Sequence, residues 1–280
     1  MSSETTSRSG DGYVMGRSDA ETRRLIRQGN FQRLFTQRFL QTAGLKPGMR
    51  VLDVGSGAGD VALVAGELVG SGGSVFGTDV NPAVLAVAQE RAQAAGFSWV
   101  TFAEGDCVEL SKQGEFDAII GRLVLIYQPD PAAALRTLSQ SIRPGGVMAF
   151  QELNFAPESL IGHPPTPLWT QFWIWFTEAF RLAGIDAYSG YNLFRHFQEA
   201  GLPAPQMELS AGIGGGLDWA GYEYAAETLR SVLPVVLKYG LATAEEVDID
   251  TMAERLRAET LAAGGVVKVP DLVGAWVLID

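Results

Sequence analysis

The sequence is poor in the residues that form disulfides and metal sites. It has one cysteine, Cys107, and two histidines, His163 and His196, in 280 residues. A single cysteine excludes an intrachain disulfide and is typical of proteins from a reducing compartment. No set of cysteines and histidines has the spacing of a zinc site, and no group of carboxylates stands out, so we expect no bound metal.

Long apolar runs and a broad basic surface are also missing. No stretch approaches the roughly 18 apolar residues of a membrane span, and the polar opening MSSETTSRSGDG lacks the apolar run of a signal peptide. We therefore expect a soluble, cytoplasmic protein with no membrane partner. The formal net charge is -11, and nine of the 21 lysines and arginines lie in the first 50 residues. Because the acidic remainder would repel a polyanion, we expect a small-molecule substrate and no nucleic acid.

What the sequence does contain is a glycine-rich turn between an apolar strand and a helix, VLDVGSGAGD at residues 51–60. The glycines at 55, 57 and 59 remove side chains where the backbone passes close to a ligand. A second strand, SVFGTD at 74–79, ends in Asp79, whose carboxylate can accept hydrogen bonds from ribose hydroxyls. The two segments predict a nucleoside-binding site at the edge of a parallel sheet.

Asp60 bears on which nucleoside is bound. A dinucleotide site rests its pyrophosphate on the start of this helix and has the motif G-x-G-x-x-G. Here Asp60 stands at the position of the last glycine, so a bound pyrophosphate would bring like charges together. A ligand that has cationic groups and no phosphate, such as S-adenosylmethionine, is favoured over a nicotinamide or flavin dinucleotide.

Further motifs follow in order: GTDVNP, EGDCVEL, FDAIIGRLVLIYQPDP and RPGGVMAFQE. With VLDVGSGAGD, they make residues 50–152 resemble the Rossmann-like (class I) S-adenosylmethionine-dependent methyltransferases of the small-molecule type. The resemblance implies methyl transfer to O, N or C of a largely apolar metabolite, with S-adenosylhomocysteine as product. Two alternatives are a nicotinamide-dependent oxidoreductase and a non-catalytic cofactor-binding or scaffold protein. A homodimer is also compatible with the sequence.

The same resemblance implies roles for the residues around the first turn. Gly55, Ser56 and Gly57 would line the methionine part of the cofactor, and Asp53 would help to order their turn. Asp79 would hold the ribose. Other interpretations stay open, since Asp53 could bond loop amides and Asp79 could belong to an ordinary helix-capping turn.

Residues further along would complete the site. By resemblance, Val80 would pack beside the adenine, and Asp106 and the backbone of Cys107 would meet its amino group and ring. Arg122 and Leu123 would flank the site. Asp106 could instead belong to a common Gly-Asp turn, and Arg122 could pair with a nearby carboxylate.

Alternating strands and helices predict an α/β fold with a doubly wound, seven-stranded, mostly parallel sheet. We expect strands at 50–55, 74–79, 98–103, 116–121, 146–152, 207–213 and 271–280, and helices near 59–69, 82–95 and 131–142. The resemblance places the last strand antiparallel between its neighbours. Residues 1–44 should form a tail and a helical lid, with a break at Gly29-Asn30. Residues 45–280 should form the methyltransferase domain, with helical insertions at about 153–190 and 217–265.

Few side chains are candidates for the chemistry at the acceptor. Glu152 ends the fifth strand and His163 follows it, so each is a candidate base or substrate contact. An amine or thiolate acceptor would need no base. Aromatic side chains share one helical face in the first insertion, and they predict either core packing or a flat substrate wall: Trp169, Phe172, Trp173, Phe176 and Phe180.

Overall fold

A seven-stranded sheet forms the centre of the molecule, which a computed structural model describes at residues 19–106, 109, 114–156 and 161–280. The sheet has the order β3-β2-β1-β4-β5-β10-β7. Its strands are β1 (Arg50–Val54), β2 (Ser74–Asp79), β3 (Val100–Glu104), β4 (Phe116–Arg122), β5 (Ile142–Asn154), β7 (Gln206–Ser210) and β10 (Asp271–Leu278). Strands β1 to β5 are parallel, and β10 lies antiparallel between β5 and β7. The α/β class, the seven strands and the place of the last strand are confirmed.

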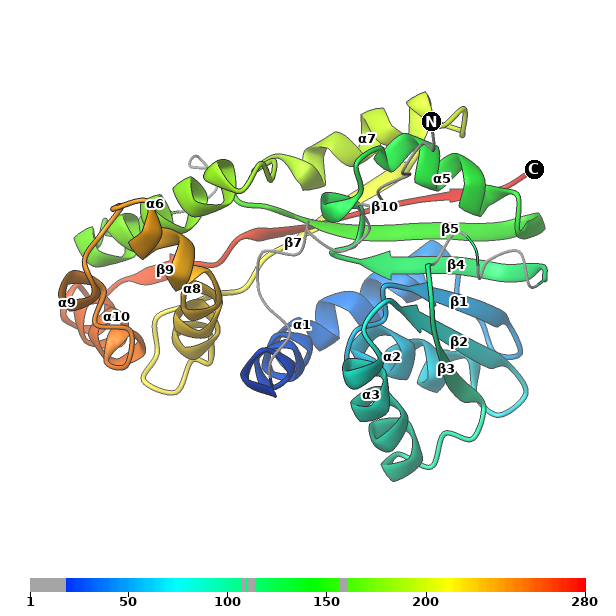
Figure 1. The fold of residues 1–280 in the computed structure, drawn as a ribbon, viewed down its shortest axis with the longest axis horizontal. Helices are drawn as coiled ribbons and strands as arrows, with labels where there is room; N and C mark the ends of the chain where they lie inside the picture. The colour runs from blue at the N-terminus through cyan, green and yellow to red at the C-terminus, as the bar shows by residue number, and fades with distance from the viewer. Residues whose placement is uncertain (1–18, 107–108, 110–113, 157–160) are drawn as a thin grey trace, which may run out of the picture.

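Helices cover both faces of this sheet (Figure 1). One face carries α1 (Asp19–Ala43), α2 (Asp60–Val69) and α3 (Pro82–Ala94), and the other carries α5 (Pro131–Ser139) and α7 (Ser189–Glu199). Successive residues of a strand point to opposite faces. Val51 therefore packs in the cluster with α1 and α2, while Leu52 packs in the cluster with α5 and α7. Burial on both faces explains why the strands are continuous apolar runs.

A further group of helices lies at the end of the sheet toward which β4 points (Figure 1). It contains α6 (Pro167–Leu182), α8 (Gly221–Lys238), α9 (Ala244–Val247) and α10 (Met252–Ala262). A small antiparallel sheet of order β6-β9-β8 belongs to the same region. Its strands are β6 (Gly162–His163), β8 (Ile213–Gly214) and β9 (Val266–Lys268). The prediction of one strand over 207–213 is wrong, because β7 ends at Ser210 and Ile213 pairs with Lys268 in the small sheet.

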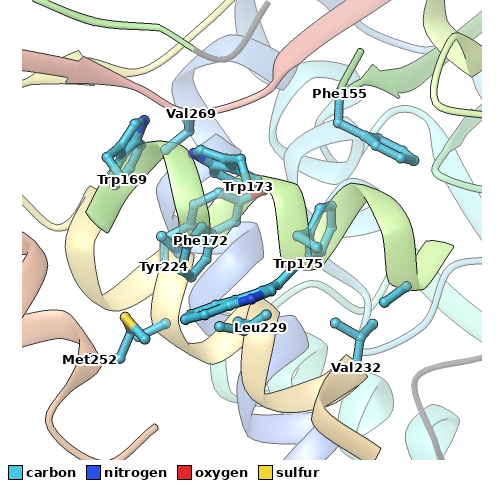
Figure 2. Packing of buried hydrophobic residues seen from close by; sticks show 14 of the residues in the cluster. Phe155, Trp169, Phe172, Trp173, Trp175, Tyr224, Leu229, Val232, Met252 and Val269 are labelled. Carbon is cyan, nitrogen blue, oxygen red and sulfur yellow. The ribbon is translucent and has the colours of Figure 1, made fainter. Parts of the chain in front are cut away.

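Aromatic side chains fill the interface between α6 and α8. Trp169, Phe172 and Trp173 of α6 are at most 2% exposed, and Figure 2 shows them packed with Tyr224 of α8. The Trp169 and Trp173 rings pack edge to face with their centroids 5.7 Å apart, an arrangement that aromatic pairs prefer. The core-packing interpretation of the aromatic face is confirmed for these residues.

The predicted break of the N-terminal helix at Gly29-Asn30 is wrong, since α1 is continuous from Asp19 to Ala43. Gly29 lies where α1 crosses α2. A Cβ atom at this position would lie 2.1 Å from Cγ of Asp60. The glycine therefore permits a close helix contact, and the packing outweighs its poor helix propensity.

No helix in the described part of the chain has both the length and the hydropathy needed to cross a membrane.

Candidate functional site

The turn between β1 and α2 requires its glycines. Gly55, Gly57 and Gly59 have φ values of 63°, 52° and 84°, a region that residues with a Cβ atom avoid. A Cβ atom on Gly55 would also lie 2.6 Å from Cγ2 of Val124. The turn therefore packs directly against the segment that follows β4.

Asp79 orders this turn from the end of the neighbouring strand. Its Oδ2 accepts a hydrogen bond from the Gly57 amide at 3.0 Å, and its Oδ1 accepts one from the Asn81 amide at 2.9 Å. Asn81 in turn caps α3 by accepting from the Ala83 amide at 3.1 Å. Since the Gly57 amide donates to Asp79, it is not directed at a phosphate. This arrangement argues against a pyrophosphate site.

Asp60 is paired, and this changes the argument drawn from the sequence. Its Oδ1 lies 2.8 Å from Nη2 of Arg91, which comes from α3. The Asp60 carboxylate is 11% exposed, so the ion pair compensates much of its charge. The repulsion between Asp60 and a phosphate is therefore weaker than the sequence suggested, and the Gly57–Asp79 bond is the stronger reason against a dinucleotide.

Asp53 is buried beneath the turn and does not line the cavity. Neither of its carboxylate oxygens has a well-aligned hydrogen-bond partner in the described residues. Burial raises the pKa of Asp53 to about 8, although the Arg122 guanidinium and the Ala62 amide lower it. A nearby cation would stabilise the ionised form of this buried carboxylate.

A cavity of about 830 Å³ opens above the turn. This volume is typical of small-molecule sites, which enclose roughly 300–1,000 Å³. The predicted cofactor residues that line it are Gly55, Ser56, Gly57, Asp79, Val80, Asp106, Arg122 and Leu123. The structure thus brings together nearly all of the cofactor residues that were predicted. Cys107 lies outside the described residues.

The cavity has two chemically different halves. The first, which we call the donor half, lies over the ends of β1, β2 and β3 and carries the carboxylates of Asp79, Glu104 and Asp106. The second, the acceptor half, is lined by the segment after β4, the end of β5, and helices α6 and α8. Its apolar side chains are Leu123, Val124, Ile126, Leu153, Phe155, Phe176 and Phe180. The described lining is thus acidic in the donor half, and apolar and aromatic in the acceptor half.

Helix α1 supplies polar side chains that the sequence did not reveal as site residues. Glu21, Arg24 and Gln28 are buried and line the cavity. The Arg24 guanidinium donates to both carboxylate oxygens of Glu21, at 2.8 and 2.7 Å, and to Oε1 of Gln28. Their spacing of three and four residues, which places side chains on one helix face, was the available signal.

Tyr224 of α8 completes the polar part of the acceptor half. Its ring stacks on Phe31 of α1 with centroids 4.7 Å apart. Burial raises the pKa of Tyr224, against the opposing fields of Arg24 and Arg122. The phenol therefore remains neutral and keeps its proton as a hydrogen-bond donor at physiological pH.

The two candidates for catalysis lie outside the cavity wall. His163 is exposed on β6, in the small sheet, and does not line the cavity. Its position therefore gives no support to a role as base or substrate contact. Glu152 is buried, and its Oε1 accepts from the Val124 and Leu125 amides at 2.9 and 2.8 Å. The described residues contain no cluster of three or more His, Cys, Asp or Glu that could hold a metal ion.

Known proteins match this chain over the region that carries the site. A family model described as a methyltransferase domain matches residues 45–168. Arsenite methyltransferase of Aquipseudomonas alcaligenes is 35% identical over 122 residues, which are 41% of this chain and 35% of that protein. The chain therefore spans little more than a third of this relative.

Two other matches extend further. The 2-phytyl-1,4-naphtoquinone methyltransferase of Synechococcus elongatus is 28% identical over 207 residues, covering 72% of this chain and 85% of that protein. A solved structure of a putative methyltransferase from Bacillus halodurans has a TM-score of 0.54 at 16% identity, covering 87% of this chain and 97% of that one. At this identity the structural match concerns the fold alone.

Proposed function

Because this chain belongs to the Rossmann-like S-adenosylmethionine-dependent methyltransferases, we propose that it methylates a small, flat and largely apolar acceptor. The observation that carries the proposal is the single cavity that joins an acidic donor half to an aromatic acceptor half. A methyltransferase must hold two ligands end to end, and one cavity with two such halves suits that task.

The acidic lining of the donor half supports S-adenosylmethionine as its ligand. The glycine turn leaves room for the methionine part, and Asp79 would accept from the ribose hydroxyls. Val80 and Asp106 would lie at the adenine, and Arg122 and Leu123 would bound the side that faces the acceptor. Asp53 lies buried beneath the turn, and a cationic ligand would stabilise its ionised form.

The acceptor half indicates what the second ligand looks like. Phe155, Phe176 and Phe180 provide an apolar aromatic surface, and Tyr127 and Tyr224 add phenol groups. Such a surface favours an aromatic ring system. The body of the protein carries a net negative charge, and we accordingly propose neither a nucleic acid nor another polyanion as acceptor.

When bound, S-adenosylmethionine supplies a methyl group on a positively charged sulfur that leaves as a neutral thioether. The protein contributes binding, alignment and the exclusion of water. Helix α1 covers the cavity with Leu25 and Gln28, while Phe176 and Phe180 shield the acceptor half. In the described residues, neither His163 nor Glu152 reaches the cavity wall. We therefore propose that alignment of the acceptor is the main contribution, and that a hydroquinone acceptor first loses a hydroxyl proton to solvent, so that no side chain acts as a dedicated base.

The two named relatives suggest different acceptors, and the composition of this chain favours one of them. Arsenic(III) is soft and binds thiolates, whereas this chain has a single cysteine and cannot offer it a pair. The name of the Synechococcus protein refers to a naphthoquinone ring, and an aromatic ring of this kind suits the aromatic lining of the acceptor half. We therefore propose an aromatic acceptor such as a reduced quinone.

Two assays test the proposal. Calorimetry should detect binding of S-adenosylhomocysteine, and Asp79→Ala should weaken it by at least about tenfold, because a charged hydrogen-bond partner contributes roughly 1.5–3 kcal/mol. Glu254→Ala, at an exposed position on α10, is the matched control and should leave the affinity unchanged. Binding of NAD instead of S-adenosylhomocysteine would support the oxidoreductase alternative.

Turnover decides the acceptor. Labelled methyl groups from S-adenosylmethionine should appear on 1,4-naphthohydroquinone and not on arsenite. Cofactor binding without transfer to any aromatic acceptor would favour the non-catalytic alternative. The homodimer remains a separate prediction, which light scattering of the purified protein can check.

A further inference from the structure

We infer that Glu152 is a positioning residue that clamps the segment after β4 and thereby shapes the wall between donor and acceptor. Its importance for methyl transfer depends on the proposed function. The clamp itself is a property of the fold and can be tested without turnover.

Strand pairing fixes the backbone of Glu152 near the end of β5. The preceding residue, Gln151, pairs with Arg122 at the end of β4, and Glu152 itself pairs with Val273 of β10. The backbone at Glu152 therefore lies within the sheet, and its side chain is 1% exposed. A carboxylate in this place has a fixed position relative to the end of β4.

The segment it holds begins with a strained turn. Leu123 has a φ of 58°, a conformation that residues other than glycine rarely adopt. The Leu123 amide still donates to the Gln151 carbonyl at 2.9 Å. After Leu123 the chain leaves the sheet and forms the short helix η1 (Leu125–Tyr127).

One oxygen of Glu152 satisfies the start of η1. Oε1 accepts from the amides of Val124 and Leu125, at 2.9 and 2.8 Å. The first amides of a helix have no partner within the helix and require an outside acceptor. The side chain that caps this helix is therefore 27 residues away in sequence and reaches it from the neighbouring strand.

The clamped segment forms a large part of the cavity wall. Leu123, Val124, Ile126 and Tyr127 all line the cavity. Val124 also touches the first turn, since a Cβ atom on Gly55 would lie 2.6 Å from its Cγ2. Movement of the segment would therefore change the acceptor wall and the glycine turn together.

The position of Glu152 indicates that it holds the segment after β4 and does not act as a general base. Glu152 does not line the cavity, so it is not placed to touch an acceptor. The hydrogen bonds from the Val124 and Leu125 amides need an acceptor oxygen on residue 152 and not a negative charge. The side-chain carbonyl of a glutamine can therefore replace the carboxylate. Burial, which raises the pKa of Glu152 to about 8, is consistent with a group that works when protonated.

Three variants of the full-length protein test the clamp. Glu152→Gln keeps the accepting oxygen, Glu152→Met keeps the size but removes it, and Glu115→Met is a control at an exposed position. In Glu152→Met, we expect the amides of Val124 and Leu125 to exchange hydrogen at least about tenfold faster, because they lose their acceptor. The affinity for S-adenosylhomocysteine should also fall several-fold. Glu152→Gln and Glu115→Met should resemble the wild-type protein in both measurements.

The opposite results would overturn the clamp. Unchanged amide exchange in Glu152→Met would show that Glu152 does not hold the segment. If wild-type amide exchange in Glu152→Gln were accompanied by complete loss of methyl transfer, Glu152 would be a base. If no methyl transfer occurs in any variant but the exchange pattern is as expected, the clamp stands and the proposed function fails.

Discussion

Replacing Gly29 by alanine tests how α1 is fixed over the cavity. The new Cβ atom would lie 2.1 Å from Cγ and 2.2 Å from Oδ1 of Asp60, far inside any van der Waals contact. Asp60 cannot simply rotate away, because it is paired with Arg91 at 2.8 Å and largely buried. The two helices must therefore separate, or the ion pair must break.

Two opposing contributions decide whether Gly29→Ala raises or lowers the free energy of unfolding. Alanine is favoured over glycine within a helix by about 1 kcal/mol. Overpacking of a closely packed site costs about 1–3 kcal/mol, and the disturbed Asp60–Arg91 pair adds to that cost. We expect Gly29→Ala to lower the free energy of unfolding by about 1–2 kcal/mol in total. Because Leu25 and Gln28 on the same helix line the cavity, the affinity for S-adenosylhomocysteine should also decrease.

Urea unfolding of a double-mutant cycle measures this contact. Asp60→Ala removes Cγ and Oδ1 and leaves only Cβ of residue 60, at 2.7 Å from the new atom. The cost of Gly29→Ala should therefore shrink by about 1 kcal/mol when Asp60 is already alanine. A stabilising effect of Gly29→Ala, or the same cost in both backgrounds, would refute the view that this contact requires glycine.

Three further predictions concern the buried carboxylates, the acceptor wall and a distant helix. Folding raises the pKa of Asp53 from 3.8 and that of Glu152 from 4.5, each to about 8. The proton-bound forms therefore stabilise the fold fully below about pH 4, and this contribution is lost as the pH rises to about 8. Urea unfolding should show a decrease of roughly 2–3 kcal/mol per carboxylate between about pH 6 and pH 8. Glu152→Gln should remove the part of this decrease that Glu152 contributes. A free energy of unfolding that does not change between these pH values would contradict the burial argument. Phe176→Leu should raise the KM for an aromatic acceptor and leave the affinity for S-adenosylhomocysteine unchanged, because Phe176 lies on α6 in the acceptor half. If the variant bound both the acceptor and S-adenosylhomocysteine more weakly to the same extent, the two halves would not be separate. Thr243→Ala removes the capping box of α9 and should lower the free energy of unfolding by about 1 kcal/mol. Its S-adenosylhomocysteine affinity should be that of the wild type, and a change would link α9 to the site.

The sequence by itself determined the sheet and the donor half of the site. Strand β1, the turn at Gly55, Gly57 and Gly59, and the carboxylate of Asp79 form a short local pattern. Each of these features depends on the backbone freedom of nearby residues or on strand alternation. Such local rules hold wherever the segment is placed, so the turn and the strand end that line the cavity could be predicted from the sequence, while their proposed cofactor roles came from the family resemblance.

Only the tertiary structure decided the pairing of buried polar groups and the acceptor half. Asp60 meets Arg91 from α3, Glu152 caps a helix that follows another strand, and Gly29 fits against α2. Arg24 on α1 and Tyr224 on α8 reach the same cavity although they lie far apart in the chain. These contacts join segments through packing, and a glycine or carboxylate looks the same in the sequence whether it ends a helix, pairs with an arginine or holds a loop. Their roles are set by which surfaces the fold buries against each other, since burial determines which polar groups must find partners.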